Sequence, residues 1–147
     1  MPPTAMTPAR HDEDLAHLLS QTERRVTERL SAALQLEGLT LAQWRVLSLL
    51  SDKAGRPMTE VAEFALLPAP TLTKVVDHMV SSNLVYRRAD LRDRRRVLIY
   101  LTARGRRLHQ RLSRDLGPAM RTLRDVADEQ DAADLTRLLL RILERLQ

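Results

Sequence analysis

The chain of 147 residues contains no cysteine, only four aromatic residues and no long apolar run. The absence of cysteine excludes disulfides, thiolate metal sites and a cysteine-based oxidation switch. Because no apolar run is long enough to span a bilayer and no signal-peptide core lies near the start, we expect a cytoplasmic protein without membrane contact. With so few aromatic rings, the core of a chain that is 44% apolar is expected to consist of Leu, Val and Ala on helix stripes.

Arrangements of residues that carry catalysis or hold a cofactor are also missing from the sequence. It has no Gly-rich phosphate loop, no Ser-His-Asp set and no paired carboxylates in turn-rich segments. The histidines lack the tight spacing with carboxylates that indicates a preformed metal site; they are His11, His17, His78 and His109. We therefore expect no enzymatic activity, no cofactor and no bound metal.

Positive charge is concentrated in one part of the chain. Residues 74–111 hold eleven Lys or Arg against three Asp, a net charge of +8 in a chain whose total is +5. Arg supplies 22 of the 24 cations, and its planar guanidinium suits phosphates and narrow grooves. Such a confined basic patch is typical of a protein that binds a polyanion. The alternative is a solvated arginine-rich face with no partner.

Two short helices and a hairpin are predicted around this basic segment. The helices are residues 59–65 and 68–83, and the second has one apolar stripe at three-and-four spacing, formed by Leu72, Val75, Val76, Met79 and Val80. β-prone runs at residues 84–88 and 97–101 flank a charged turn at residues 90–96. This order predicts a winged helix-turn-helix, a mainly α fold with a small β-hairpin wing (α+β).

The face of the second helix opposite its apolar stripe carries small, hydroxylic and basic side chains. Such a face suits the major groove of DNA, which admits a helix and offers base edges to hydroxyls and cations. The predicted base-contacting residues are Ala69, Thr71, Thr73, Lys74 and His78. Two alternatives stay open: Thr73 as an ordinary surface residue, and His78 as a neighbour of a phosphate.

Helices on either side of the winged helix are expected to form a dimerisation domain. Residues 12–36 and 103–146 carry apolar stripes larger than a winged helix at residues 39–102 can cover, so we expect a homodimer with a two-fold interface. The alternative is a monomer whose terminal helices pack on each other. Residues 1–10, with three prolines, are predicted to be a flexible N-terminal arm, and residues 11–147 a single domain.

The hairpin contains the string DRRRVLIYLT, in which Asp93-x-Arg95 is followed after five residues by Leu-Thr. This string resembles the wing signature of the MarR (multiple antibiotic resistance regulator) family of transcription factors. The blocks LTLAQWRVLSLL and PTLTKVVDHM also fall where that family has matching blocks, so the resemblance covers residues 15–146. It implies that Arg95 enters the minor groove and that Asp93 orients it. Three further arginines are then expected near phosphates, namely Arg92, Arg94 and Arg96.

Resemblance to this family implies a repressor that binds a pseudopalindromic operator in double-stranded DNA as a homodimer. The alternative is an architectural or protein-interaction winged-helix module without specific operator binding. Members of the family are usually released from DNA by a small phenolic or aromatic acid, and His17, Trp44 and Arg45 are candidates for contacting such an effector. For Trp44 the alternative is packing against Leu39 as a hydrophobic staple, and a lone His is usually structural.

Overall fold

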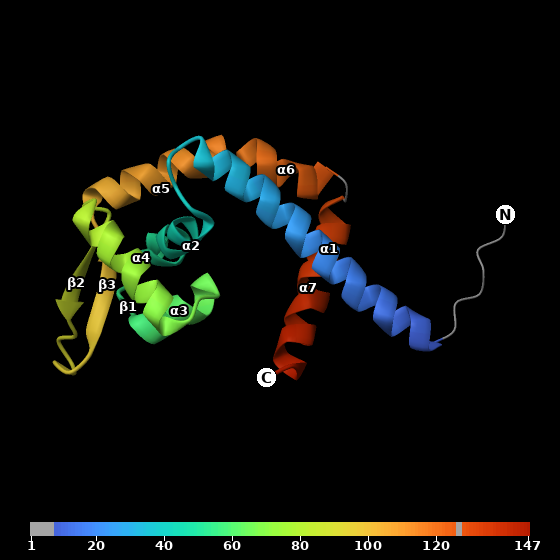
Figure 1. Cartoon of the computed structure of the whole chain (residues 1–147), viewed down its shortest axis with the longest axis horizontal. Helices are drawn as coiled ribbons and strands as arrows, with labels where there is room; N and C mark the ends of the chain where they lie inside the picture. Colours follow the sequence, from blue (N-terminus) through green and yellow to red (C-terminus); the bar gives the residue numbers. More distant parts are fainter. Residues whose placement is uncertain (1–7, 126–127) are drawn as a thin grey trace. The chain divides into compact units, whose positions relative to one another are not determined.

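The computed structural model describes residues 8–125 and 128–147, and the side chains of residues 8–13, 120 and 122–124 lie outside that description. The chain forms two compact units, residues 1–41 and residues 42–147. The elements (Figure 1) are α1 Pro8–Gln35, α2 Leu41–Leu49, the 3₁₀ helix η1 Leu50–Asp52, β1 Arg56–Pro57, α3 Met58–Ala65, α4 Ala69–Ser81, β2 Val85–Ala89, β3 Val97–Leu101, α5 Ala103–Asp115, α6 Gly117–Asp125 and α7 Glu129–Arg145. In the described part of the chain no helix combines the length and the apolarity needed to cross a bilayer.

The mainly α fold with a β-hairpin wing is confirmed. Helices α3 and α4 are followed by the hairpin of β2 and β3, and β1 extends the hairpin to a three-stranded antiparallel sheet with the order β1-β3-β2. The sequence did not predict β1, because two residues are too few to show an alternating pattern. Tyr86 lies opposite Tyr100 in the hairpin register, and their rings stack with centroids 5.4 Å apart.

The first helix starts earlier than the sequence indicates. Helix α1 begins at Pro8, so residues 8–10 of the predicted arm are helical. Proline is well tolerated at the first helical position, because the amide hydrogen that it lacks has no partner there. Residues 1–7 of the predicted arm lie outside the described residues. The assignment of residues 11–147 to a single domain stays a prediction.

The core of the winged helix is built from the predicted apolar stripe of α4. Leu72, Val76 and Met79 are fully buried, whereas Val75 is half-buried and Val80 is 36% exposed at the edge of the stripe. The stripe packs with buried side chains of α3 and the hairpin, which include Val61, Ala65, Leu84, Val85, Ile99 and Leu101. Burial of this stripe fixes which face of α4 remains available to a partner.

Thr102 joins the end of the hairpin to the start of α5. Its hydroxyl donates a hydrogen bond to the Asn83 carbonyl at 2.7 Å and accepts one from the Gly105 amide at 2.9 Å. The second bond is an N-cap, which satisfies one of the free amides of the first helical turn. Gly105 packs so closely that an added Cβ would lie 2.1 Å from the Leu84 carbonyl oxygen.

The predicted C-terminal helices within residues 103–146 are α5, α6 and α7. Pro118 falls in the first turn of α6, where the amide hydrogen that proline lacks would have no partner in the helix. Helix α7 has no buried residue along its 17 residues. Its exposed leucines are Leu135, Leu138, Leu139, Leu140 and Leu143.

Candidate nucleic-acid interface

The exposed face of α4 carries the five residues predicted to contact bases. Ala69, Thr71, Thr73, Lys74 and His78 are all exposed. At 100° per residue Thr71, Lys74 and His78 lie on the side of the helix away from its buried stripe, whereas Ala69 and Thr73 lie along the edge of the stripe. Pro70 and Asp77 are also exposed on the side away from the stripe. The sequence analysis did not select them, although at 100° per residue both fall near the centre of the polar side of the helix.

Helix α4 begins without a side-chain cap. Its N-cap residue is Pro68, in an extended conformation, and its side chain makes no capping hydrogen bond. The Pro68 carbonyl accepts the Leu72 amide at 3.0 Å, which starts the helical ladder. Pro70 in the first turn has no amide hydrogen that would need a partner. The start of the helix is therefore stabilised by the fixed backbone angles of its prolines.

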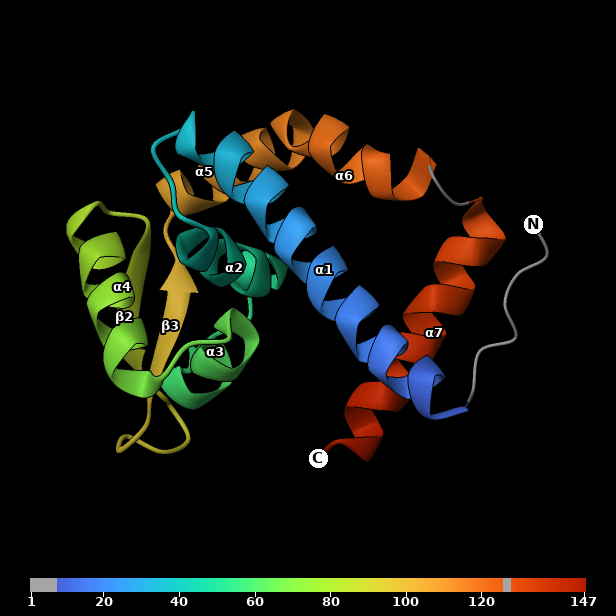
Figure 2. The ribbon, with the colours of Figure 1, turned by 45° about the vertical axis from the view of Figure 1, so that its right-hand side comes forward.

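The first turn of α4 and the tip of the wing lie toward the same edge of the winged helix (Figures 1 and 2). After α4 the chain reverses at Asn83, which has a left-handed φ of 56°, and β2 runs back along the helix. The 13 residues of α4 span about 20 Å and the five residues of β2 about 17 Å, so the two ends are nearly level. A single surface can therefore meet both.

An ion pair joins α4 to the hairpin beside this surface. The Asp77 carboxylate of α4 lies 2.5 Å from the Arg87 guanidinium of β2. Both side chains are partly exposed, 58% for Asp77 and 35% for Arg87, so the pair contributes little to stability in water. The pair links the helix to the strand on their exposed side.

Two aspartates shape the backbone of the wing tip. The Asp90 carboxylate accepts the Arg92 amide at 2.9 Å, and the Asp93 carboxylate accepts the Arg95 amide at 3.0 Å. The Asp90 amide donates to the Arg96 carbonyl at 2.9 Å, which closes the loop. Asp93 therefore orients the backbone of Arg95 in this structure, through an Asx-type turn rather than through its guanidinium.

The arginine side chains of the tip carry positive charge that no described carboxylate neutralises. Arg92, Arg94, Arg95 and Arg96 are exposed, and in residues 8–125 and 128–147 no acidic group forms an ion pair with them. Four unpaired guanidinium groups on one short loop create a positive potential that attracts phosphates and narrow grooves. The wing tip and the exposed face of α4 together form the candidate interface.

Comparison with known proteins shows which family the winged helix resembles. The MarR family model matches residues 37–96, which include α2, α3, α4 and the wing tip. The Bacillus subtilis HTH-type transcriptional regulator MhqR is 26% identical over 125 residues, which are 85% of this chain and 86% of that protein. The matched segment is therefore similar to the MarR family. The MarR signature residues Asp93 and Arg95 lie in the matched segment, at the tip of the wing.

Two further comparisons extend over most of the chain. The homoprotocatechuate degradative operon repressor of Escherichia coli is 29% identical over 101 residues, which are 69% of this chain and 68% of the repressor. The solved structure of the transcriptional repressor CouR, bound to a 23-mer DNA duplex, matches with a TM-score of 0.78 and 25% identity. That match covers 95% of this chain and 99% of the CouR chain. The resemblance therefore includes the helices that flank the winged helix.

The residues predicted to contact an effector lie in different surroundings. His17 is exposed on α1, whereas Trp44 and Arg45 are half-buried on α2. The Trp44 ring stacks on His109 of α5 with centroids 5.0 Å apart, and burial lowers the pKa of His109. Arg45 donates to the Ala65 carbonyl at 3.2 Å, at the end of α3. Trp44 and Arg45 thus connect α2 to two other helices of the same unit, and their role toward an effector stays a prediction.

Proposed function

We propose that this protein is a MarR-family, cytoplasmic transcriptional repressor that binds a pseudopalindromic operator as a homodimer and is released by a small aromatic or phenolic acid. The observation that carries the proposal is the shared surface of the exposed face of α4 and the wing tip. A helix in the major groove and an arginine loop in the neighbouring minor groove require this arrangement. No catalytic step is part of the proposal, because the relatives are transcriptional regulators.

The homodimer is supported by apolar surface that the single chain leaves exposed. The α7 leucines Leu135, Leu140 and Leu143 are each more than half exposed, as are Leu15 and Leu18 of α1. Burial of apolar area is worth about 25 cal/mol per Å², so helices with this much exposed leucine are stabilised by a partner. A second copy offers the same helices and closes a two-fold interface.

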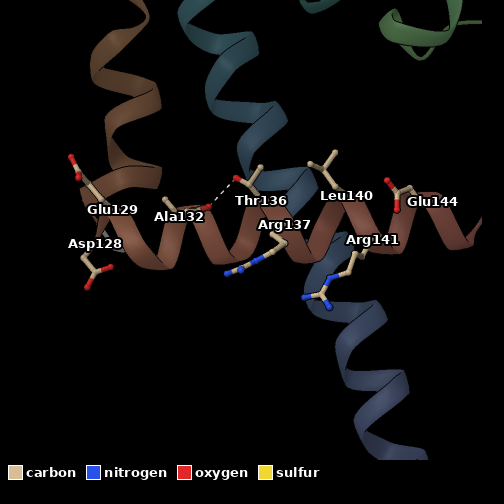
Figure 3. Close-up of a pocket in the computed structure, with 9 residues that line it drawn as sticks. Asp128, Glu129, Ala132, Thr136, Arg137, Leu140, Arg141 and Glu144 are labelled. Carbon is tan, nitrogen blue, oxygen red and sulfur yellow. Dashed lines mark hydrogen bonds between the residues drawn. The ribbon is translucent and has the colours of Figure 1, made fainter.

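The charges of α7 also suit a second copy. Figure 3 shows the residues of α7 that line a shallow hollow, with Thr136 and Leu140 on one side and Arg137 and Arg141 on another. The N-terminal end of the same helix is acidic, since it carries Asp128, Glu129 and Asp131. In a two-fold interface the same patch occurs on both subunits, so an acidic end and a basic middle can pair across the axis.

Dimer symmetry determines the form of the operator. Two recognition helices related by a two-fold axis fit half-sites about one helical turn apart, roughly 10 bp, so the operator should be an inverted repeat. The wing of each subunit would then contact the minor groove that flanks its half-site. Repression rather than activation is supported by two of the compared proteins, which are described as repressors.

The effector class is supported by the relatives and by one feature of the chain. The Escherichia coli relative represses an operon for degradation of homoprotocatechuate, an aromatic acid. The Trp44 and His109 rings of this chain form a half-buried aromatic pair, onto which a further ring could stack. We propose Trp44, Arg45 and His17 as the effector contacts, with Trp44 supplying the aromatic face and Arg45 a cation for the acid.

Competition binding tests the central proposal. Duplexes enriched by the protein from a random pool should contain an inverted repeat and should stay bound in excess unrelated DNA, because specific sites bind typically 10³ to 10⁷ times tighter. Affinity should fall about a thousandfold or more between roughly 50 and 200 mM salt if about six phosphates are contacted. An architectural module would instead be titrated away by the unrelated DNA, and that result would overturn operator binding.

Light scattering during size-exclusion chromatography tests the dimer. The protein should elute with twice the mass of one chain at micromolar concentration. Leu143→Glu should shift it toward the monomer, since the substitution buries a charge in the proposed interface. Leu66→Glu, at an even more exposed leucine in the winged helix, should leave the dimer intact. A monomeric wild-type protein would remove the argument for an inverted repeat.

A further inference from the structure

The approach to α4 and its first two residues form a largely exposed run without polar side chains. The five successive residues Leu66–Pro70 carry no side-chain hydrogen-bond donor or acceptor. All of them except Leu67 are exposed. The run ends inside α4, because Ala69 is the first residue of the helix and Pro70 the second. A recognition helix that begins in this way offers its first two residues to DNA as an apolar surface.

Thr73 adds to this apolar surface one helical turn later. It lies four residues after Ala69, so the two side chains are neighbours on the helix. The Thr73 hydroxyl donates to the Ala69 carbonyl at 3.0 Å, which uses its only proton inside the helix. What an exposed Thr73 can still offer a partner is its γ-methyl group and an acceptor oxygen. On the same exposed face, Thr71 and Lys74 have polar donors that are not taken up by a hydrogen bond of this kind.

The base edges of the major groove contain one apolar group, the C5-methyl of thymine. In a helix-turn-helix it is the N-terminal part of the recognition helix that contacts base edges. Alanine and the methyl group of threonine are the side chains that pair with the thymine methyl. We infer that Ala69 and Thr73 read thymine methyl groups in each half-site, so that this part of the operator is specified by apolar contact. The inference rests on the proposed binding of an operator.

Replacement of thymine by uracil tests this inference directly. Uracil pairs as thymine does and differs only by lacking the C5-methyl. The full-length protein is first used to enrich duplexes from a random pool, and the best duplex is then made with uracil at one thymine position at a time. We expect each half-site to contain two thymines whose replacement, one at a time, weakens binding about fourfold, the change that corresponds to one buried methyl-sized group. Uracil at other positions should leave the affinity unchanged.

Two variants of Thr73 separate its methyl group from its hydroxyl. Thr73→Val keeps a methyl in the same place and loses the hydroxyl, so it should retain the preference for thymine over uracil. Thr73→Ser keeps the hydroxyl and loses the methyl, so its thymine and uracil duplexes should bind almost equally at the position that Thr73 contacts. Ala69→Gly should have the same effect at a second position. These residues are exposed, and unchanged melting temperatures would confirm that the variants are folded.

Equal binding of thymine and uracil duplexes at every position would overturn the inference while leaving operator binding intact. Loss of the thymine preference in Thr73→Val but not in Thr73→Ser would also overturn it, because the hydroxyl would then be the reading group. If no duplex is enriched from the pool, the proposed function fails and the inference fails with it. In that case the apolar run Leu66–Pro70 would be a surface for a protein partner.

Discussion

The Asp77 carboxylate on α4 lies 2.5 Å from the Arg87 guanidinium on β2. These residues are ten positions apart, and the chain reverses between them at Asn83. The ion pair therefore joins the helix that we propose to enter the major groove to the strand that leads to the wing tip. It also engages one arginine of the hairpin that would otherwise be available to phosphates.

Asp77→Asn should reduce the specificity of DNA binding more than its strength. The substitution removes the link between α4 and β2 and also removes a negative charge beside DNA. We expect the affinity for unrelated duplexes to be equal or higher and the affinity for the operator to fall, so the ratio of the two dissociation constants should decrease. The free energy of unfolding should change by only about 0.2–1 kcal/mol, because the pair is partly exposed.

A double-mutant cycle with Arg87→Gln distinguishes the ion pair from a simple change in charge. If the pair is responsible, the two substitutions together should cost less in specificity than the sum of their separate effects. Asp125→Asn serves as the control, because Asp125 is exposed on α6 and the charge change is the same. A specificity ratio that is unchanged in Asp77→Asn would show that the link has no role in recognition.

Arg95→Ala should weaken operator binding by about 1 to 3 kcal/mol, the scale of one good specific contact. The expected cause is the loss of a guanidinium from the minor groove, where a narrow A·T-rich stretch has an enhanced negative potential. A mobility-shift titration measures the effect, with Arg29→Ala as a control of equal charge change on α1. Equal affinities of the Arg95 variant and the wild-type protein would exclude the predicted role of the wing.

Gly105→Ala should lower the free energy of unfolding by about 1–3 kcal/mol or more, because an extra methyl group in a well-packed contact costs this amount. The added Cβ would lie 2.1 Å from the Leu84 carbonyl oxygen, which belongs to the backbone and cannot rotate away. Gly117→Ala is the matched control, since a Cβ there meets nothing within 4 Å. Urea unfolding of the two variants should differ clearly; a similar loss in both would contradict the proposed contact.

Stability should decrease in mild acid because of His109. Burial lowers the pKa of His109 below its ordinary value of 6.5, so the folded state favours the neutral ring. As the pH falls, the unfolded chain takes up the proton before the folded protein does. The contribution of the neutral His109 ring to the free energy of unfolding is therefore complete above pH 6.5 and is lost as the pH falls through the lower pKa of the folded state. The melting temperature of the wild-type protein should fall more between pH 7 and pH 5 than that of His109→Gln.

His17→Gln is the control for this pH dependence, because His17 is exposed on α1. It should show the same loss of melting temperature as the wild-type protein. Fluorescence of Trp44 gives a second measurement, since Trp44 is the only tryptophan and its ring stacks on His109. An identical pH profile in His109→Gln would assign the acid sensitivity to other groups.

The sequence was sufficient for the architecture of the winged helix because its signals are local. The three-and-four spacing of Leu72, Val76 and Met79 predicted the buried stripe of α4, and these residues are buried. The charged turn between two β-prone runs predicted the hairpin, which is present with β2 and β3. Patterns of this kind repeat within one element, so neighbouring residues are enough to reveal them.

Features that depend on distant residues were not predictable in this way. The strand β1 exists because Arg56 and Pro57 lie beside β3, about 40 residues later in the chain. The bond from Arg45 to the Ala65 carbonyl and the pair of Asp77 with Arg87 likewise follow from tertiary packing. The resemblance predicts that Asp93 orients Arg95 in the minor groove, and this role stays a prediction. The structure shows that the Arg95 amide donates to the Asp93 carboxylate, a contact that the sequence alone does not reveal.

The hydrogen bonds within the wing tip have a consequence for the kinetics of release from DNA. Since Asp90 and Asp93 already hold the loop backbone, little conformational entropy has to be lost when the arginines reach a groove. A loop with a free backbone would lose that entropy on every binding event and would dissociate sooner. We therefore expect residence time on the operator to depend on two aspartates that carry the same sign of charge as the DNA itself.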